Sequence, residues 1–307
     1  MLILLWGVGS DGPLAAVRQE LQDLGVPTSV IDQRHVLSTE VDLDVDSGVS
    51  GAVRSPRGRV ELGAVTAVYL RPYDCRCLPL IAQAGPDSAA WRHALMVNDI
   101  LSSWSQLTRA LVVNPLGETA ANGSKPYQLR QIRGLGFRVP ETLVTTDPNA
   151  AYAFWQQHGT VIYKSVSAVR SIVSRLQPEH VQRLGDVSSC PTQFQQYIAG
   201  RDYRVHVVGS ELFACEVICE ADDYRYAGRQ AVEIRPCRLP QDVEERCRQL
   251  ATAMQLSVAG IDLRHHVNGD WYCFEVNPSP AFTYYQQATG QPIGCAVARL
   301  LAAGPPG

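Results

Sequence analysis

Short apolar runs alternate with a helix-like segment at the start of the chain. Residues 2–6 and 26–32 are apolar or β-branched runs, and residues 13–24 between them carry apolar side chains at helical spacing before Gly25. Another run of the same kind lies at 65–72. Strands and a helix joined by short connections predict a parallel sheet.

The pattern continues through the middle of the chain with both kinds of element. The predicted elements are a helix at 88–108, a strand at 111–115, a helix at 124–137, a strand at 138–148, a helix from the cap residue Asn149 to Gly159, and a strand at 160–167. Gly134 or Gly136 is expected to end the helix at 124–137. A second structural part therefore begins near Asn114.

After Arg201 the pattern becomes that of antiparallel strands. One predicted hairpin turns at Gly209-Ser210 and a second turns at Asn268-Gly269, a dipeptide typical of two-residue β-turns. Helices are predicted at 241–255 and 291–302. The fold class is therefore α/β (α+β), with a parallel sheet first and an antiparallel sheet last.

Composition and charge narrow the class of protein. At roughly 150 residues per domain, 307 residues suggest about two domains. The net charge of −3 argues against a protein that coats nucleic acid. The apolar N-terminus is too short for a membrane span and lacks the basic start of a signal peptide. The nine cysteines show no C-x-x-C spacing, so we expect reduced, buried thiols, no structural metal and a cytoplasmic protein.

The last predicted hairpin brings acidic side chains together. A two-residue turn at Asn268-Gly269 places Asp262 opposite Glu275 and Gly260 opposite Asn277. Side chains two residues apart share a face of a strand, so the two carboxylates and the amide converge on one patch that Gly260 leaves open.

Two directly opposed carboxylates repel each other, so a positive group is expected between them. An oxygen-only set of Asp262, Glu275 and Asn277 suits Mg²⁺, which in proteins commonly also binds substrate phosphates. The alternative is that one carboxylate is solvated and the other pairs with Arg264.

Five short motifs then point to one family. They are N-G-S-K-P (122–126), V-I-Y-K-S (161–165), Q-Q-Y-I-A-G-R-D-Y-R-V (195–205), G-I-D-L-R (260–264) and F-E-V-N-P (274–278). In this order they resemble the ATP-grasp carboxylate–amine ligases, in the branch of the ribosomal-protein glutamate ligases. The resemblance covers roughly residues 110–302. It implies an N-terminal α/β domain (1–115) and an ATP-grasp domain (116–307), with a lid at about 146–199 and a metal-binding part at 200–307.

The resemblance also implies roles for individual residues. Lys125 and Lys164 would bind the ATP phosphates. The backbone of Gln196, Tyr197 and Ile198 would meet adenine, and Asp202 would lie at the ribose. Arg204 would face the γ-phosphate and the acyl phosphate, and one or two Mg²⁺, or Mn²⁺, would be held by Asp262, Glu275 and Asn277. The strand pattern adds that Arg204 shares a face with His206, which we interpret as a packed neighbour.

One stretch departs from this family. A glycine-rich loop usually follows the second lysine, whereas residues 165–171 contain no glycine. The hydroxyls of Ser165 and Ser167 and the guanidinium of Arg170 would then replace the backbone cradle for phosphate. The alternative is a lid that moves less or binds phosphate differently.

A narrower resemblance is to the graspetide maturases of the microviridin type, which crosslink ribosomal peptides. It rests on V-Y-L-R-P (68–72), D-D-Y-R (222–225) and N-P-S-P-A-F-T-Y-Y-Q-Q-A-T-G-Q-P-I (277–293), where Pro280-Ala281 replaces the family's Gly-Gln. Arg71, Arg225 and Tyr284 would bind an acidic substrate, with Arg225 at the catalytic centre; packing roles are the alternative.

The resulting hypothesis is an ATP-dependent ligase that activates a carboxylate as an acyl phosphate and joins it to an amine or a hydroxyl. The substrate would be a small molecule or a peptide, with no nucleic acid or membrane partner, and the protein would be a homodimer as many relatives are. The alternatives are a graspetide-type macrocyclase, a non-catalytic nucleotide- or peptide-binding module, and a dinucleotide oxidoreductase suggested by Gly7, Gly9 and Gly12 with Asp32.

Overall fold

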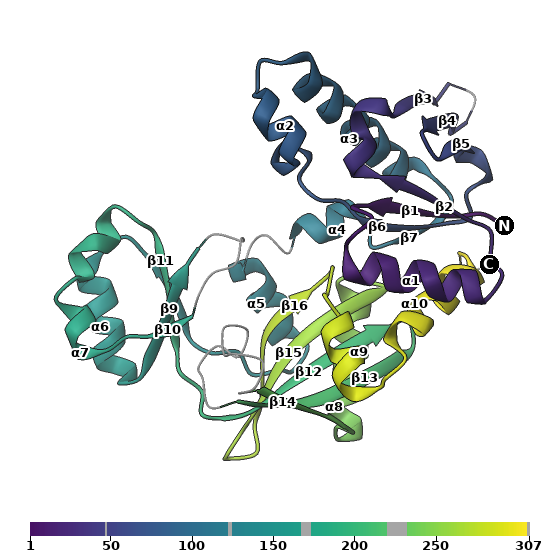
Figure 1. Cartoon of the computed structure of the whole chain (residues 1–307). Helices are drawn as coiled ribbons and strands as arrows, with labels where there is room; N and C mark the ends of the chain where they lie inside the picture. Colours follow the sequence, from purple (N-terminus) through teal and green to yellow (C-terminus); the bar gives the residue numbers. More distant parts are fainter. Residues whose placement is uncertain (47, 122–124, 167–172, 220–231, 306–307) are drawn as a thin grey trace.

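The computed structural model describes residues 1–46, 48–121, 125–166, 173–219 and 232–305. Its N-terminal sheet has the order β2 (Thr28–Asp32), β1 (Ile3–Gly7), β6 (Ala67–Arg71) and β7 (Leu111–Val113). All three pairings in it are parallel, which confirms the predicted parallel sheet. Figure 1 shows this sheet at the upper right, apart from the lobe that carries β8–β11.

Helices flank the N-terminal sheet on both faces. They are α1 (Gly12–Asp23), α2 (Pro79–Ala84) and α3 (Ala89–Leu107), with α4 (Leu116–Ala121) leading out of it. The side chain of Asp11 caps α1 by accepting a hydrogen bond from the N–H of Leu14 at 2.9 Å. Leu14, Val17 and Leu21 recur at helical spacing and are fully buried.

A small antiparallel sheet lies at the edge of this lobe and was not predicted from the sequence. It consists of β3 (Glu40–Asp44), β4 (Ser50–Ser55) and β5 (Gly58–Glu61). Its strands are short and partly exposed, so the apolar content of each is too low to form a run.

Asp32, at the end of β2, is a buried carboxylate held by cations. Its side chain is inaccessible to solvent and accepts hydrogen bonds from the Arg34 guanidinium, at 2.6 Å for the shortest, and from the Gly9 N–H at 3.2 Å. Burial raises the pKa of Asp32, but the hydrogen bonds from the Arg34 side chain and backbone and from Gly9 outweigh it, and the pKa falls to about 2.

Replacing Asp32 with Asn is expected to lower the free energy of unfolding at pH 7 by about 2 kcal/mol, because the folded pKa lies below the ordinary value. This stabilisation is complete above the ordinary pKa of 3.8 and is lost as the pH falls through about 2. Urea unfolding of both proteins between pH 7 and pH 2 measures it. Asp74→Asn is the control, since Asp74 makes the same paired contact with Arg76 at an exposed site. An equal loss in both variants would contradict the account.

The C-terminal sheet is antiparallel and has the order β14 (Val232–Cys237), β13 (Glu211–Cys219), β12 (Gly200–Val208), β15 (Val258–His266) and β16 (Trp271–Asn277). The predicted hairpin at Gly209-Ser210 is confirmed by the β12–β13 register. The helices of this part are α5 (Lys125–Gly134), α8 (Gln241–Ala253), α9 (Thr283–Thr289) and α10 (Ile293–Ala303). In Figure 1, α9 and α10 lie toward α1, which both helices contact.

The middle sheet has the order β10 (Ser174–Arg175), β9 (Val161–Ser165), β11 (Thr192–Gln196) and β8 (Thr142–Thr145). Helices α6 (Pro148–His158) and α7 (Pro178–Val181) cover one face of it. The predicted Asn149 cap of α6 is wrong. Asp147 is the cap, and its side chain accepts from the Asn149 N–H at 2.9 Å because Pro148 fills the first helical position. Gly159 ends the helix at φ 68°, as predicted.

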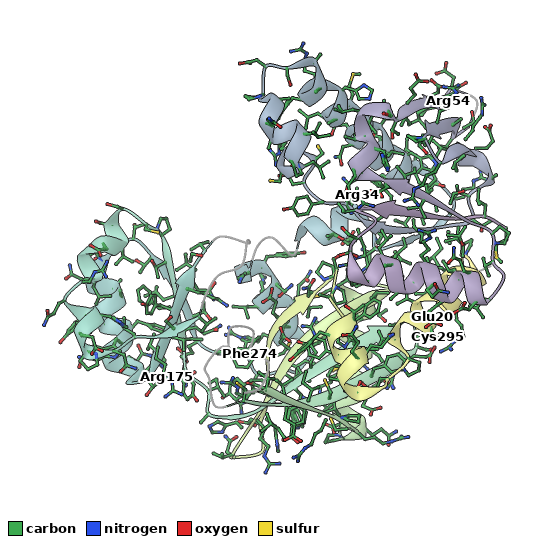
Figure 2. The ribbon with its side chains drawn as sticks, viewed as in Figure 1. Glu20, Arg34, Arg54, Arg175, Phe274 and Cys295 are labelled. Carbon is green, nitrogen blue, oxygen red and sulfur yellow. The ribbon has the colours of Figure 1, made fainter. Side chains whose placement is uncertain are left out.

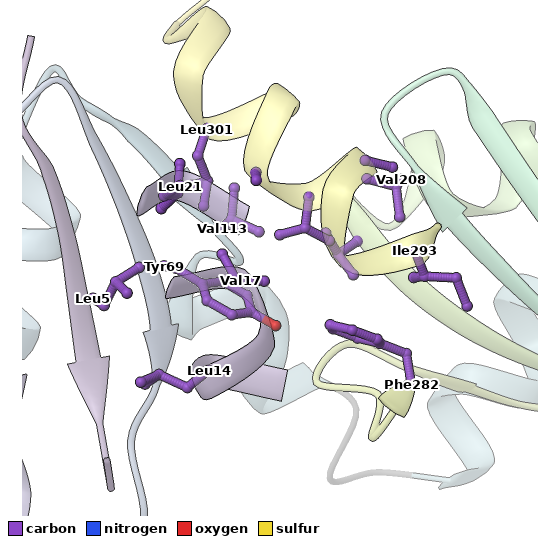
Figure 3. Close-up of a cluster of buried hydrophobic side chains, with 14 of the residues drawn as sticks. Leu5, Leu14, Val17, Leu21, Tyr69, Val113, Val208, Phe282, Ile293 and Leu301 are labelled. Carbon is purple, nitrogen blue, oxygen red and sulfur yellow. The ribbon is translucent and has the colours of Figure 1, made fainter. Parts of the chain in front are cut away.

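The hydrophobic core joins the N-terminal and C-terminal sheets. One cluster combines Leu5, Tyr69 and α1 side chains with Val208 of β12 and Leu301 of α10 (Figure 3). The middle sheet has a separate small core around Val161 and Phe194. The middle sheet therefore has few apolar ties to the rest of the chain, whereas the other two sheets share one packed interior.

The expectation that the cysteine thiols are buried is confirmed for some of them only. Cys75, Cys215, Cys247 and Cys273 are buried free thiols, but Cys77 and Cys190 are exposed, so burial of all nine was wrong. Within the described ranges, no helix combines the length and apolar character needed to cross a membrane.

Candidate active site

The β15–β16 hairpin has the predicted pairing of the acidic residues, but its turn and its strand register differ from the prediction. Asp262 pairs with Glu275 and Gly260 pairs with Asn277. The turn is not the predicted two-residue turn, because the backbone N–H of His266 bonds Asp270 O and places three residues in the loop. A β-bulge between Asp262 and Leu263 shifts the register back. The extra residue in the turn and the extra residue at the bulge offset each other in the register. The predicted pairing of Asp262 with Glu275 is therefore correct, although the predicted two-residue turn is wrong.

The bulge has a second effect on the site. Phe274 is the extra residue of β16, since Leu263 pairs with Cys273 and Asp262 with Glu275. Strict alternation would send Phe274 and Glu275 to opposite faces, yet both line the same pocket. Bulges commonly redirect side chains in this way next to functional sites.

Arg204 is the positive group beside the acidic pair. Its Nη1 donates to Asp262 Oδ1 at 2.7 Å, and the two residues are directly paired on β12 and β15. The alternative in which Arg264 neutralises one of these carboxylates is wrong. Arg264 instead forms a two-bond pair with Asp202, at 2.6 and 2.7 Å. Its Nη1 also donates to Ile198 O at 2.7 Å, which ties β15 to the segment between β11 and β12.

Gly260 makes room for Arg204 rather than leaving an open patch. A Cβ atom at Gly260 would collide with the Arg204 guanidinium and would lie 2.7 Å from the Pro280 side chain. His206 is fully buried beside Arg204, and its Nε2 accepts from Arg204 Nε at 3.4 Å. Burial, with the neighbouring guanidinium, holds the pKa of His206 well below its usual value. His206 is therefore a neutral packed neighbour, as predicted.

A pocket is lined by residues of both the middle sheet and the C-terminal sheet. It is lined by Lys164, Gln196, Tyr197, Ile198, Asp202, Asp262 and Glu275, all of them residues singled out from the sequence. Its apolar walls include Ile162 and Phe274, which were not predicted as site residues from the sequence. Figure 2 labels Arg175 on the middle sheet and Phe274 on the C-terminal sheet. Ile162 was detectable, since it lies two residues from Lys164 on the same strand face.

The predicted adenine segment lies at the end of β11 in this pocket. The backbone N–H groups of Gln196 and Tyr197 donate to Glu141 O and Thr160 O, and Ile198 O accepts from Arg264. A bound base would therefore use other backbone groups of the segment. The Tyr197 ring lies under Arg175 at 4.4 Å, and its hydroxyl accepts from Arg175 Nη2 at 3.0 Å. These contacts hold the ring in the lining of the pocket.

The structure describes two of the remaining predicted residues, and three others lie outside the described ranges. Lys125 begins α5, the helix that lies against β16, and Ser165 ends β9 at an exposed position outside the pocket lining. Ser167, Arg170 and Arg225 lie outside the described residues.

Arg71 makes contacts that favour the packing alternative over a contact with substrate. Its guanidinium forms a two-bond ion pair with Asp11, and Nη1 donates to Ser279 Oγ at 2.9 Å and to Pro280 O at 3.3 Å. Its side chain is only 9% exposed. Tyr284 is partly exposed and its ring contacts that of Tyr285.

The donor chemistry of the site fits a hard divalent cation. Asp262 and Glu275 together carry two negative charges, and Arg204 offsets one of them. Asn277 Oδ1 accepts from the Ser279 N–H at 2.9 Å, which fixes the orientation of the amide. Two carboxylates and an amide are oxygen ligands of the kind that Mg²⁺ prefers when phosphates complete its shell. In the described part of the chain, no cluster of three or more His, Cys, Asp and Glu side chains is placed to hold a metal ion.

The first loop does not form a dinucleotide site. A Cβ atom at Gly9 would collide with Asp32 and Arg34, and one at Gly7 would meet the Arg71 backbone. The Asp32 carboxylate, which a ribose would need, is already bonded to Arg34 and to the Gly9 N–H. The three glycines therefore serve close packing around β1 and α1.

Comparison with known proteins gives the class that this fold and site define. The family model described as the RimK-like ATP-grasp domain matches residues 127–301, more than half of the chain. The chain therefore belongs to the RimK-like ATP-grasp family. It is an ATP-grasp enzyme of the ADP-forming ligase class, and the ATP-grasp fold expected from the motifs is confirmed.

Solved structures with the same fold match nearly the whole chain. The macrocyclase MdnC bound with precursor peptide MdnA, from Microcystis aeruginosa MRC, is 23% identical over 98% of this chain and 99% of its own, with a TM-score of 0.83. A Chryseobacterium gregarium RiPP-associated ATP-grasp ligase in complex with ADP and a leader and core peptide is 21% identical over 99% and 97%, with a TM-score of 0.85.

The ATP-grasp ligase PsnB, complexed with minimal precursor, Mg and ADP, is 24% identical over 98% of this chain and 96% of its own, with a TM-score of 0.81. No curated protein matches this sequence. The structural neighbours agree with the predicted resemblance to graspetide maturases.

Proposed function

We propose that this enzyme uses ATP and Mg²⁺ to activate a carboxylate of a peptide and to join it to an amine or a hydroxyl of the same peptide. The single observation that carries the proposal is the pocket in which Lys164 of the middle sheet meets Asp262 and Glu275 of the C-terminal sheet. A cation and a pair of acidic side chains on facing walls suit a nucleotide phosphate bound through Mg²⁺.

Within this proposal, each group of the predicted site residues has a role of its own. Lys164, with Lys125 from α5, binds the phosphates as mobile positive charges. The segment of Gln196, Tyr197 and Ile198 holds the base, and Asp202 lies at the ribose. Asp262, Glu275 and Asn277 hold Mg²⁺, which neutralises phosphate charge when bound. Ser165, Ser167 and Arg170 complete the phosphate site, and Arg225 contributes to the catalytic centre.

Two steps follow from this arrangement. A carboxylate oxygen of the substrate forms a bond to the γ-phosphorus, and the bond to the β–γ bridging oxygen breaks as ADP leaves. The amine or hydroxyl then bonds to the acyl carbon, and inorganic phosphate and a proton are released. Arg204, buried and held against Asp262, stabilises the charge on the transferring phosphoryl group. Neither step needs a nucleophile from the protein.

The peptide substrate is supported by the neighbours, which are described as bound to precursor, leader or core peptides. Macrocycle formation through side-chain amides or esters is the form of the reaction that this support favours. We also propose the division into domains at 1–115 and 116–307, the lid at about 146–199, Mn²⁺ as a substitute metal, a homodimer and a cytoplasmic location.

Incubation with ATP, Mg²⁺ and peptides rich in Thr, Ser, Lys, Asp and Glu tests the proposal. The expected result is release of ADP together with loss of one water from the peptide mass per bond formed, and no loss when ATP is omitted. ADP release that depends on free amino acids, with every peptide unchanged in mass, would contradict the peptide substrate. Mass spectrometry and a coupled ADP assay supply both readouts.

A further inference from the structure

Among the described residues, no strand lies along the outer edge of β16, and three separate groups bond it instead. The Arg138 backbone bonds Trp271 O and the Cys273 N–H, at 3.1 and 2.9 Å. Beyond the bulge at Phe274, the Gln128 side chain bonds both backbone groups of Val276. Beyond β16, the amide of Asn114 donates to Pro278 O at 2.5 Å. Backbone groups of this edge are therefore bonded at three points by parts of the chain far away in sequence.

Gln128 is placed to act as a one-residue substitute for a strand. Its Nε2 donates to Val276 O at 2.8 Å, and its Oε1 accepts from the Val276 N–H at 3.0 Å. The side chain is 3% exposed, so both bonds form away from water. Val276 lies between Glu275 and Asn277, the two residues of β16 that the proposed function assigns to Mg²⁺.

The direction of these bonds fixes the register after the bulge. The N–H and C=O of one strand residue point to the same edge, and those of its neighbours point to the other edge. Because Gln128 binds Val276 at the outer edge, Glu275 and Asn277 direct their backbone groups toward β15, where they pair with Asp262 and Gly260. A slip by one residue would turn both side chains to the opposite face.

Gln128 also lies one helical turn from Lys125 on the same face of α5. The same side chain therefore fixes the distance between the start of α5 and the acidic pair. We propose that Gln128 is a positioning residue, which holds Glu275 and Asn277 in register and sets α5, with Lys125, against them. This inference rests on the proposed function, since it needs Glu275 and Asn277 to bind Mg²⁺.

The test measures ADP affinity by calorimetry, with Mg²⁺ and with EDTA, for the full chain. The ratio of the two affinities reports the contribution of the metal, and ADP permits no onward chemistry. Gln128→Ala is expected to reduce this ratio about 10-fold, the scale of loss for groups that orient metal ligands. Gln131→Ala is the matched control, because Gln131 lies on the same helix and bonds Tyr127 Oη at 2.9 Å. Its ratio should equal that of the wild type.

A combined variant separates positioning from general damage to the fold. In the Asn277→Ala background, Gln128→Ala is expected to lower the ratio much less than in the wild type, because one of the groups through which it acts is already missing. An undiminished effect would overturn the inference. If Gln128→Ala fails to fold, Gln128→Met keeps the volume of the buried side chain and removes both bonds to Val276, and it should reduce the ratio by a similar factor. A wild-type ratio in that variant would also overturn the inference.

The failure of the inference differs from the failure of the proposed function. If Asn277→Ala keeps the full metal-dependent ratio, the assignment of Asn277 to Mg²⁺ is wrong, and the inference falls with it. If Asn277→Ala loses the ratio while Gln128→Ala retains it, the metal site stands and the positioning role of Gln128 is wrong.

Discussion

Glu275→Gln is expected to lower ADP formation about 10²- to 10³-fold, the range found when one electrostatic contact of a transition state is removed. The acidic pair carries two negative charges and Arg204 offsets one of them. The substitution would leave Asp262 and Arg204 as a neutral pair with little attraction for a divalent cation. A coupled assay of ADP release at saturating ATP measures the effect, and the metal-dependent gain in ADP affinity should disappear with it.

The matched control for this variant is Glu233→Gln. Glu233 lies on β14 of the same sheet, is 55% exposed, and pairs with Arg235 at 2.6 Å. Its replacement should leave ADP formation within a factor of about two, because exposed ion pairs contribute little. Full activity in Glu275→Gln, or an equal loss in both variants, would exclude Glu275 from the metal site.

Lys164→Ala is expected to reduce ADP formation about 10³-fold, comparable with the loss of a single cationic group in other phosphoryl transfers. Lys164 is on β9, paired with Gln193 of β11, so its backbone is fixed by the middle sheet. Lys164→Arg should recover part of the activity, because it restores the charge in a different shape. Assays of ADP release over a range of ATP concentrations separate the effects on binding and on turnover.

Arg183→Ala provides the comparison for Lys164. It also removes one positive charge from the part of the chain around the middle sheet, but Arg183 is 79% exposed and pairs with Asp186 at 2.9 Å. We expect its ADP formation to match that of the wild type. A similar loss in Arg183→Ala would mean that the general charge of this lobe matters and that Lys164 has no specific contact with phosphate.

The parts of the site that follow from strand geometry could be predicted from the sequence. Asp262 and Glu275 were placed opposite each other, and Arg204 was placed with His206 on a face opposite Val205 and Val207. Both results depend on the two-residue period of a strand, which tertiary contacts rarely change. The family motifs further placed Lys164 and the segment after β11 on one pocket.

The contacts between distant segments could not be predicted. No local pattern indicates the three-residue turn, or the bulge that leaves Phe274 unpaired in the β15–β16 ladder. The pairing of Arg264 with Asp202, and not with the acidic pair, depends on the register of β12 against β15. The packing role of Arg71 depends on Ser279, 208 residues away. These contacts are set by the packing of whole elements, and one chain read in isolation carries no signal for them.

The lysine content of the chain makes the central claim open to direct measurement. The chain has only two lysines, Lys125 and Lys164, although it has 25 arginines. Both are assigned to the phosphates of one nucleotide. Reductive methylation with an isotope label keeps the charge of each lysine and gives each a separate NMR signal, which Lys→Arg variants assign.

Titration of the methylated protein with ADP and Mg²⁺ is the most direct test of this account. We expect the signals of Lys125 and Lys164 both to shift and to do so with the same midpoint. We also expect Glu275→Gln to weaken the Mg²⁺ dependence of both shifts. Binding of ADP that leaves the Lys164 signal unmoved would contradict the proposed site between the middle and C-terminal sheets.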